Sequence, residues 1–154
     1  GVETQGPRRT GFGAVAYDSA RGVLVVPGLF GGPDSGTWEW DGTTWKHIQT
    51  TPPVPRQTFA LTYDPGRGVV VLAGGQGTHG GPYFDDVWTW NGARWDQLLT
   101  TGPRPPGRGG ATLTSDPRNN RLLYFGGYNE ALLNDLWALR GNVWTKLGPS
   151  AVDE

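Results

Sequence analysis

The sequence contains no cysteine, no methionine and only two histidines. The lack of cysteine excludes disulfide bonds, thiolate metal sites and a cysteine nucleophile, and it leaves the redox compartment undecided. His47 and His79 are the only imidazole groups available for base catalysis or metal binding. We therefore expect no metal site and no cofactor, and we assign no catalytic residue.

The sequence also lacks a charge excess and a long apolar run. Its 13 basic and 14 acidic residues give a formal net charge of -1, which provides no basic surface for nucleic acid or an anionic membrane. No apolar run approaches the roughly 20 residues of a membrane-spanning helix. We expect a soluble domain with neither nucleic acid nor membrane as a partner, and the sequence does not indicate a compartment.

Glycine, proline and tryptophan are abundant instead, with 26, 13 and 8 residues. The length of 154 residues suits one domain with a sizeable core. The tryptophans recur with a period of about 50 residues, which is typical of propeller repeats. Each copy has a first tryptophan and a closing one, at Trp38 and Trp45, Trp88 and Trp95, and Trp137 and Trp144.

Each copy of the repeat predicts four short β-strands with turns between them. The second copy has an inner strand near 58–63, a turn at 64–68 and an apolar strand at 69–73. No stretch of ten or more residues shows a 3.6-residue apolar stripe, so helix should be almost absent. Asp41-Gly42 and Asn91-Gly92, between the tryptophan arms, predict two-residue type I′ turns. Residues 1–10 are similar to the later connectors and are expected to be a connector too.

The repeat resembles the kelch repeat over essentially the whole chain. The resemblance rests on two glycine doublets, on an aspartate two residues before a tryptophan, and on the closing tryptophans: Gly74-Gly75, Gly126-Gly127, Asp86, Asp135, Trp45, Trp95 and Trp144. The first copy departs from it with Gly28-Leu29 and Gly36. The resemblance implies an all-β propeller, a single array over residues 1–154 whose four-stranded antiparallel blades span about 8–49, 55–99 and 106–147.

Three blades form a half-propeller that cannot close a ring, because propellers need about four to eight blades. Each end blade would leave an apolar sheet face in water, which soluble monomers avoid. We therefore expect a homodimer in which two chains join head to tail and complete six blades.

Strand parity places the long, variable loops and the inter-blade connectors on one face, which is where binding residues usually lie. Arg9, Arg56 and Arg108 stand at the entrances of the inner strands. Three guanidinium groups around one axis would hold an anionic or carboxylate ligand; alternatively, each bonds carbonyls or a carboxylate of a neighbouring blade. Asp86 and Asp135 are expected to cap loop amides, although carboxylates also suit a hard cation.

The resemblance to kelch propellers implies ligand contacts just after these arginines and just after the glycine doublets. These positions are Thr10, Gln57, Thr58, Gly109, Gln76, Thr78, His79, Tyr128, Asn129 and Glu130, with Pro33, Asp34 and Ser35 in the first copy. Amide, hydroxyl, imidazole and phenol groups suit a peptide, a protein surface or a glycan. The residues do not choose among these.

Three functions remain open from the sequence. The first is a binding or scaffold module that self-assembles and recognises a peptide, glycan or protein partner through the long loops. The second is a lyase, isomerase or hydrolase with an axial site that uses arginine and Tyr128 or His79. The third is an excised or engineered propeller fragment without activity of its own, which the start at Gly1 within a connector suggests.

Overall fold

The computed structural model describes residues 2–3, 5–8, 13–29, 31–32 and 34–148. Regular structure in this part of the chain is β-strand, apart from one 3-10 turn, η1 (Pro117–Asn119). This confirms the all-β prediction. Within the same residues, no helix has the length and hydropathy that crossing a membrane requires.

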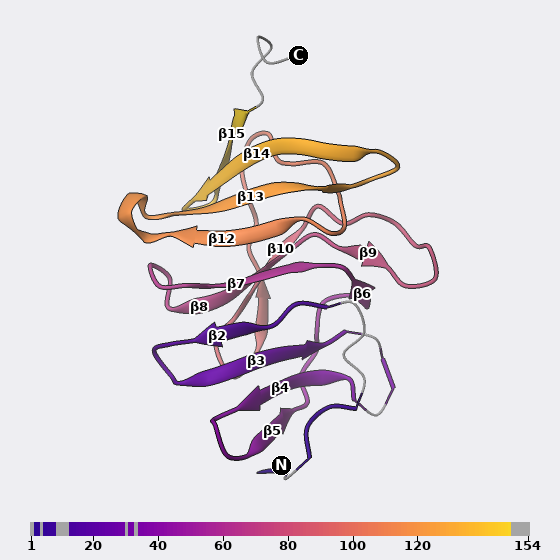
Figure 1. Ribbon diagram of the computed structural model, residues 1–154, viewed down its shortest axis with the longest axis vertical. Coiled ribbons are helices and arrows are strands. Elements are labelled where there is room, and N and C mark those ends of the chain that lie inside the picture. Colours follow the sequence, from indigo (N-terminus) through magenta and orange to yellow (C-terminus); the bar gives the residue numbers. More distant parts are fainter. Residues whose placement is uncertain (1, 4, 9–12, 30, 33, 149–154) are drawn as a thin grey trace.

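Three antiparallel sheets are stacked along the long axis of the molecule, with their inner strands side by side in Figure 1. Within each sheet the four repeat strands follow chain order from inner to outer, as the repeat predicted. The first sheet has β2 (Ala16–Asp18), β3 (Val23–Gly28), β4 (Gly36–Trp40) and β5 (Trp45–Ile48). The second has β7 (Ala60–Asp64), β8 (Val69–Ala73), β10 (Val87–Trp90) and β11 (Trp95–Gln97). The third has β12 (Thr112–Asp116), β13 (Arg121–Tyr128), β14 (Leu132–Arg140) and β15 (Val143–Gly148).

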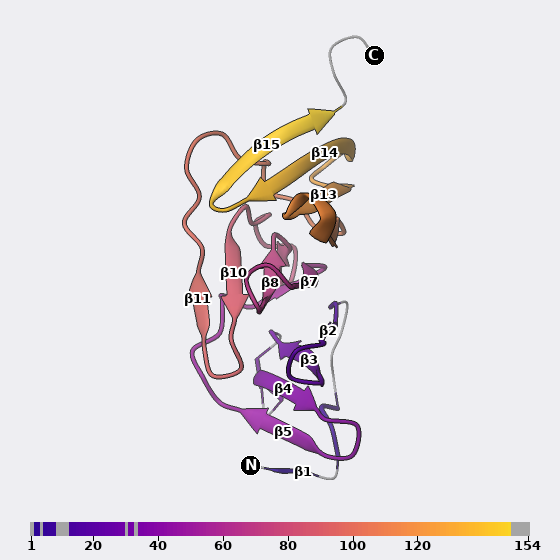
Figure 2. The ribbon, with the colours of Figure 1, turned by 90° about the vertical axis from the view of Figure 1, so that its left-hand side faces the viewer.

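Two short additions complete this propeller-like arrangement. β6 (Arg56–Gln57) pairs with β9 (Gln76–Gly77) beside the second sheet. β1 (Val2–Glu3) pairs with Lys46 and Trp45 of β5 and becomes an outer fifth strand of the first sheet, as Figure 2 shows beside β5. The expectation that residues 1–10 form only a connector was therefore wrong. The outer edge of β5 offers unpaired backbone groups, and the chain start satisfies some of them.

The hairpin turns between the tryptophan arms differ from the prediction. A type I′ turn requires positive φ at both central residues, but only Gly42 and Gly92 have it, and Asp41 and Asn91 do not. The amides of Asp41 and Asn91 instead donate to the carbonyl oxygens three residues later, at 3.3 and 3.4 Å. The Asp41 carboxylate accepts hydrogen bonds from the amides of Thr43 and Thr44, at 2.9 and 2.8 Å. The Asn91 amide oxygen accepts the equivalent pair in the second sheet. In each turn, the side-chain oxygen of the Asp or Asn accepts hydrogen bonds from the amides two and three residues later. The prediction of a type I′ turn did not consider these side-chain bonds.

The core consists of two apolar clusters, one at each junction between neighbouring sheets. Strand β8 contributes to both, because alternate side chains of a strand point to opposite faces. Val70 and Leu72 face the first sheet, whereas Val71 faces the third, and all three are 0% exposed. The second sheet is therefore buried on both faces, as the middle of a stack must be.

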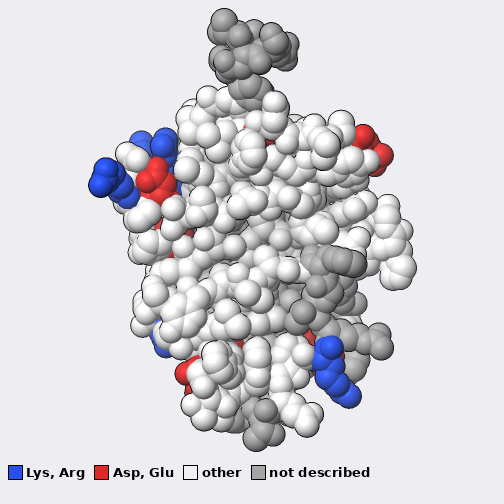
Figure 3. All heavy atoms as spheres, viewed as in Figure 1, with Lys and Arg blue, Asp and Glu red and all other residues white. Residues whose placement is uncertain are grey.

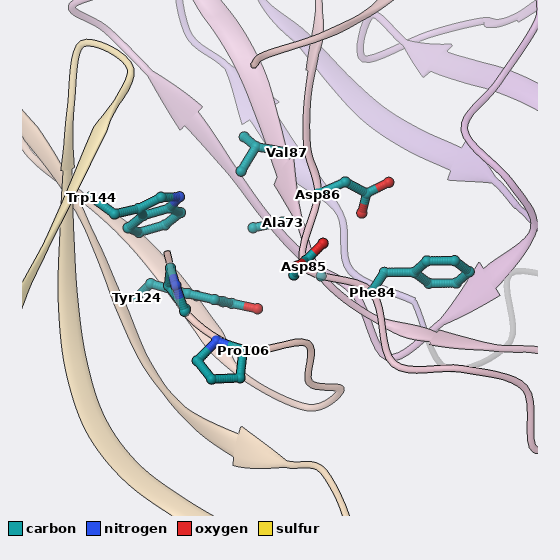
Figure 4. Close-up of a pocket in the computed structure, with 10 residues that line it drawn as sticks. Ala73, Phe84, Asp85, Asp86, Val87, Pro106, Tyr124 and Trp144 are labelled. Atoms are coloured by element: carbon teal, nitrogen blue, oxygen red, sulfur yellow. The ribbon is translucent and has the colours of Figure 1, made fainter. Parts of the chain in front are cut away.

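Tryptophan side chains cross these junctions and reach polar groups of the preceding sheet. Trp95 donates its indole N–H to the hydroxyl of Thr37 at 2.8 Å. At the next junction Trp144 occupies the repeat position of Trp95, but Val87 occupies the position of Thr37. The buried indole nitrogen of Trp144 has no hydrogen-bond partner among the described residues, and Figure 4 shows it on the side of the ring toward Val87.

We expect Val87→Thr to be at least as stable as the wild type, although a buried Val→Thr change normally destabilises. The new hydroxyl would accept from Trp144, and an unsatisfied buried donor costs about 1–3 kcal/mol. Val71→Thr, in the same cluster, is the matched control and should lower the free energy of unfolding by about 1 kcal/mol or more. Urea denaturation measures both. Equal losses in the two variants would contradict this explanation.

Candidate functional site

The long loops gather along one edge of the three sheets, on the right-hand side of Figure 1. This edge contains the loop between β8 and β10, the β13–β14 hairpin, and the segments that enter β7 and β12. We call it the loop face and define it by residues 56–59, 74–86, 108–111 and 128–132. The sequence predicted that binding residues would lie on these loops.

Arg56 anchors the second sheet at the loop face from a fully buried position, with 0% of its surface exposed. Its guanidinium donates to both carboxylate oxygens of Asp86, at 2.5 and 2.9 Å. The same group donates to the carbonyl oxygens of Gly74 and Val54, each at 3.0 Å. The ring of Phe84 lies 4.0 Å from the guanidinium carbon. The guanidinium group of Arg56 therefore makes its hydrogen bonds and its ring contact within the protein.

Arg108 repeats the same arrangement in the third sheet. It is 1% exposed and donates to Asp135 at 2.5 and 2.9 Å, and to the carbonyl oxygens of Gly126 and Pro106. The indole N–H of Trp137 also donates to the carboxylate of Asp135, at 2.8 Å. Trp88 donates to Asp86 in the same way, at 2.7 Å. Each Arg–Asp–Trp unit therefore connects the entrance of an inner strand to the third strand of the same sheet, next to the start of β10 and in the middle of β14.

These contacts decide between the two roles considered for the arginines. Arg56 and Arg108 bond carbonyl oxygens and a carboxylate, as the alternative stated, but within their own sheet and not with a neighbouring one. Their charge is thereby neutralised, and they are not available to hold an anionic ligand. The main partners of Asp86 and Asp135 are arginine and tryptophan side chains, and not the loop amides that they were expected to cap. Arg9, the third member of the expected ring, lies outside the described residues.

The carboxyl groups of Asp86 and Asp135 have pKa values below their ordinary value. Burial alone would raise each pKa, but the hydrogen bonds from the arginine and the tryptophan, together with the charge of the arginine, outweigh it. A carboxyl group whose pKa is lowered by folding stabilises the protein above its unfolded-state pKa of about 3.9. This contribution is lost as the pH falls through the lower folded-state pKa.

The free energy of unfolding should consequently be nearly constant from about pH 7 to pH 5 and fall steeply below about pH 4. Urea titrations at a series of pH values measure this profile. Asp135→Asn, which cannot ionise, should be less stable at pH 7 and should lose less stability on acidification than the wild type. An unchanged acid slope in this variant would show that Asp135 is not responsible.

Several predicted contact residues do come together on the loop face. Gln57 of β6 pairs with Gln76 of β9, and the amide of Gly110 donates to the carbonyl oxygen of Thr58 at 2.8 Å. Gly109 and Tyr128 form a two-way backbone bridge, at 3.0 and 2.8 Å. The entrances of β7 and β12 are thereby joined to the long loops of both sheets.

Two tyrosines form the aromatic part of this face. The rings of Tyr83 and Tyr128 meet edge to face with centroids 6.2 Å apart, and Tyr128 is 44% exposed. Desolvation, the charge of Glu130 and its hydrogen bond raise the pKa of the Tyr83 phenol. Sequence reasoning missed Tyr83, although an aromatic residue in the long loop between β8 and β10 was a usable signal.

Backbone strain is concentrated on the same face. Four described residues other than glycine have a left-handed φ, and three of them are predicted site residues: Thr58 at 54°, His79 at 60° and Glu130 at 79°. The fourth, Asn120 at 50°, lies at the opposite edge between η1 and β13. Thr58 is the least expected, because β-branched residues rarely adopt this conformation.

The remaining predicted residues are more dispersed. His79 is exposed and Thr78 is half-buried, both on the turn at 78–81 beyond β9. Asn129 is half-buried at the tip of the β13–β14 hairpin. In the first copy, backbone oxygens of Asp34 and Ser35 bond Trp38 and His47. Thr10 and Pro33 lie outside the described residues.

Two hollows, one bordering the loop face and one along the inner strands, are less distinctive. The one drawn in Figure 4 lies between the second and third sheets beside Asp86 and Tyr124, and its volume of about 10 Å³ suits one water molecule. An open groove of about 440 Å³ runs along the inner strands and is lined by uncharged residues such as Tyr17, Thr62 and Tyr63. In Figure 3 the middle of this side of the molecule is free of charged side chains. Among the described residues, no group of His, Asp and Glu is placed to hold a metal ion.

The fold has a known counterpart. A solved structure described as "Structure of YjhT" matches with a TM-score of 0.70 over 97% of this chain and 52% of that chain. The two sequences are 17% identical, so the match establishes the fold alone. The chain spans about half the length of this counterpart. No family model and no curated protein matches the chain.

Proposed function

We propose that this chain is a three-bladed segment of a kelch-type propeller that acts as a binding module, with the loop face as its ligand site. The observation that carries the proposal is the concentration of strain there. Three non-glycine residues with left-handed φ lie on the loop face, and Thr58 is one of them. Strained backbone of this kind costs about 1–3 kcal/mol per residue and clusters at ligand sites.

The chemistry of the loop face supports a polar ligand, either a peptide or a glycan. Tyr83 and Tyr128 offer ring surfaces for stacking, and the nearby Gln57 and Gln76 offer amide groups that donate and accept. Glu130 is exposed on the hairpin tip. Because Arg56 and Arg108 are neutralised, a neutral or basic ligand is favoured over an acidic one.

Arrays that carry neutral and acidic glycans together with basic and acidic peptides test this proposal. The wild-type protein should bind a neutral or basic subset, and Tyr128→Ala should lose that binding while keeping its unfolding transition. Leu99→Ala is the control, since Leu99 is 71% exposed and lies outside the four segments that define the loop face. Binding that survives Tyr128→Ala, or a preference for acidic ligands, would contradict the proposal.

The variant Thr58→Gly tests whether the backbone strain at Thr58 lowers stability and supports ligand binding. Relief of a left-handed threonine should gain about 1–2 kcal/mol, while the freer unfolded chain costs about 0.4–1 kcal/mol. We expect a net gain in the free energy of unfolding and weaker ligand binding. Asn120→Gly is the matched control at the opposite edge, and it should change stability by a few tenths of a kcal/mol, because asparagine tolerates this conformation, and leave binding unchanged.

A further inference from the structure

In the part of the chain that the structure describes, the two end sheets of the stack each have one face on which no other sheet packs. On the first sheet, Val15, Tyr17 and Trp40 are 53%, 58% and 37% exposed. On the third sheet, Phe125, Val143 and Leu147 are 51%, 46% and 43% exposed. Exposed apolar surface of this extent on a sheet face indicates an interaction site.

The repeat shows what each open face is built to contact. Trp90 of the second sheet crosses to the first sheet and donates to Glu39 at 3.1 Å, from a position that is 0% exposed. Trp40 occupies the repeat position of Trp90, and Ala138 occupies that of Glu39. Trp40 therefore resembles Trp90, but no described sheet lies where its side chain could cross. Conversely, no described tryptophan crosses to the third sheet at Ala138, where Trp90 crosses to the first sheet at Glu39.

A hollow lies at the position where such a tryptophan would enter. It has a volume of about 470 Å³ and is lined by Ala138, Val143, Thr145, Leu147, Arg121 and Arg140. The hollow is present because the side chain of Ala138 is small. In the first sheet, the larger side chain of Glu39 takes up the equivalent space. An indole ring fits this volume, and the guanidinium groups at its border favour an aromatic ring.

We propose that two copies of this chain close one ring head to tail, with Trp40 of each copy seated in the hollow over Ala138 of the other. Two copies bring six sheets together, within the range of four to eight that closes a propeller. The length of the fold counterpart agrees, because this chain covers 52% of it. Two copies of this chain together have about the length of that counterpart.

The inner strands continue the stack across the new junctions. Within the chain, β2 packs beside β7 and β7 beside β12, so β12 of one copy would lie beside β2 of the other. Gly6 already packs against the ring of Trp45, which leaves Trp40 and Tyr17 as the open part of the first sheet. Each loop face would then occur twice around the ring. This assembly does not depend on the ligand proposed above.

Sedimentation of the full chain with two variants tests the proposal. Trp40→Asp removes the inserted side chain, and Ala138→Trp fills the hollow. Each variant alone should raise the dimer dissociation constant at least about 30-fold, as loss of a central tryptophan does. An equimolar mixture should recover a 1:1 species, because one junction then consists of an intact Trp40 and an intact hollow. Leu99→Asp should behave as the wild type.

Other outcomes would overturn the inference. A wild-type chain that sediments as a monomer at every concentration has no such partner in a second copy. A Trp40→Asp variant that stays dimeric, while Ala138→Trp does not, would indicate that third sheets pair with each other. A mass that grows without limit would indicate an open filament instead of a closed ring.

Discussion

Replacing Arg108 with alanine is expected to lower the free energy of unfolding by about 3–5 kcal/mol, the usual cost of breaking a buried ion pair. The side chain is 1% exposed and bonds Asp135 twice. Its loss leaves the carboxylate without its cation and removes one hydrogen bond each from the carbonyl oxygens of Gly126 and Pro106. Urea denaturation at fixed protein concentration measures the effect, since any self-association would add to stability.

Three further variants determine whether the loss of stability comes from the ion pair between Arg108 and Asp135. Arg108→Lys keeps the charge but loses the two-point contact, and should lie between wild type and Arg108→Ala. The double variant Arg108→Met with Asp135→Leu should recover part of the loss, because no buried charge is left alone, while the hydrogen bonds to Gly126, Pro106 and Trp137 stay lost. Arg94→Ala removes an exposed pair with Asp96 and should change stability by less than about 0.5 kcal/mol. A loss below about 1 kcal/mol in Arg108→Ala would contradict the anchoring role.

Trp90→Ala is expected to cost about 3–5 kcal/mol, because it opens a large cavity at the junction of the first two sheets. The indole is 0% exposed, lies 5.4 Å from the ring of Trp95, and bonds Glu39. Glu39 is itself 5% exposed and keeps its ion pair with Arg21 at 2.5 Å. Thermal and urea denaturation should both show the loss.

Trp40→Ala is the matched control at the same repeat position. Trp40 is 37% exposed in the single chain, so at low protein concentration its removal should cost well under half as much as Trp90→Ala. Trp90→Phe separates the two parts of the effect, since it keeps most of the ring volume and removes only the donor to Glu39. Equal costs for Trp90→Ala and Trp40→Ala would show that the sheet junction is not the source of stability.

The repeat made most of the fold predictable. Tryptophans at fixed spacing and the apolar runs at 23–26 and 69–73 located the strands, and a meander is the simplest order for strands joined by short turns. The start of the chain was harder to predict. The pairing of Val2–Glu3 with β5 depends on a free sheet edge, which has no signature in a two-residue strand.

The site was predicted less completely, for a physical reason. Arg56 and Asp86 are far apart in sequence, and whether an arginine faces a ligand or a carboxylate depends on a three-dimensional contact that spacing alone does not define. The loops themselves were predicted correctly as the place where Thr58, Gln76 and Tyr128 gather. The left-handed conformation of Thr58 was not predictable, because threonine gives no local signal for it.

Light scattering of the unmodified protein after gel filtration, over a concentration series, tests most directly the claim that these three sheets are half of a closed ring. The account predicts a constant mass near twice 16.6 kDa. A constant mass of 16.6 kDa at all concentrations would contradict it, because both end faces would then remain in water without a partner.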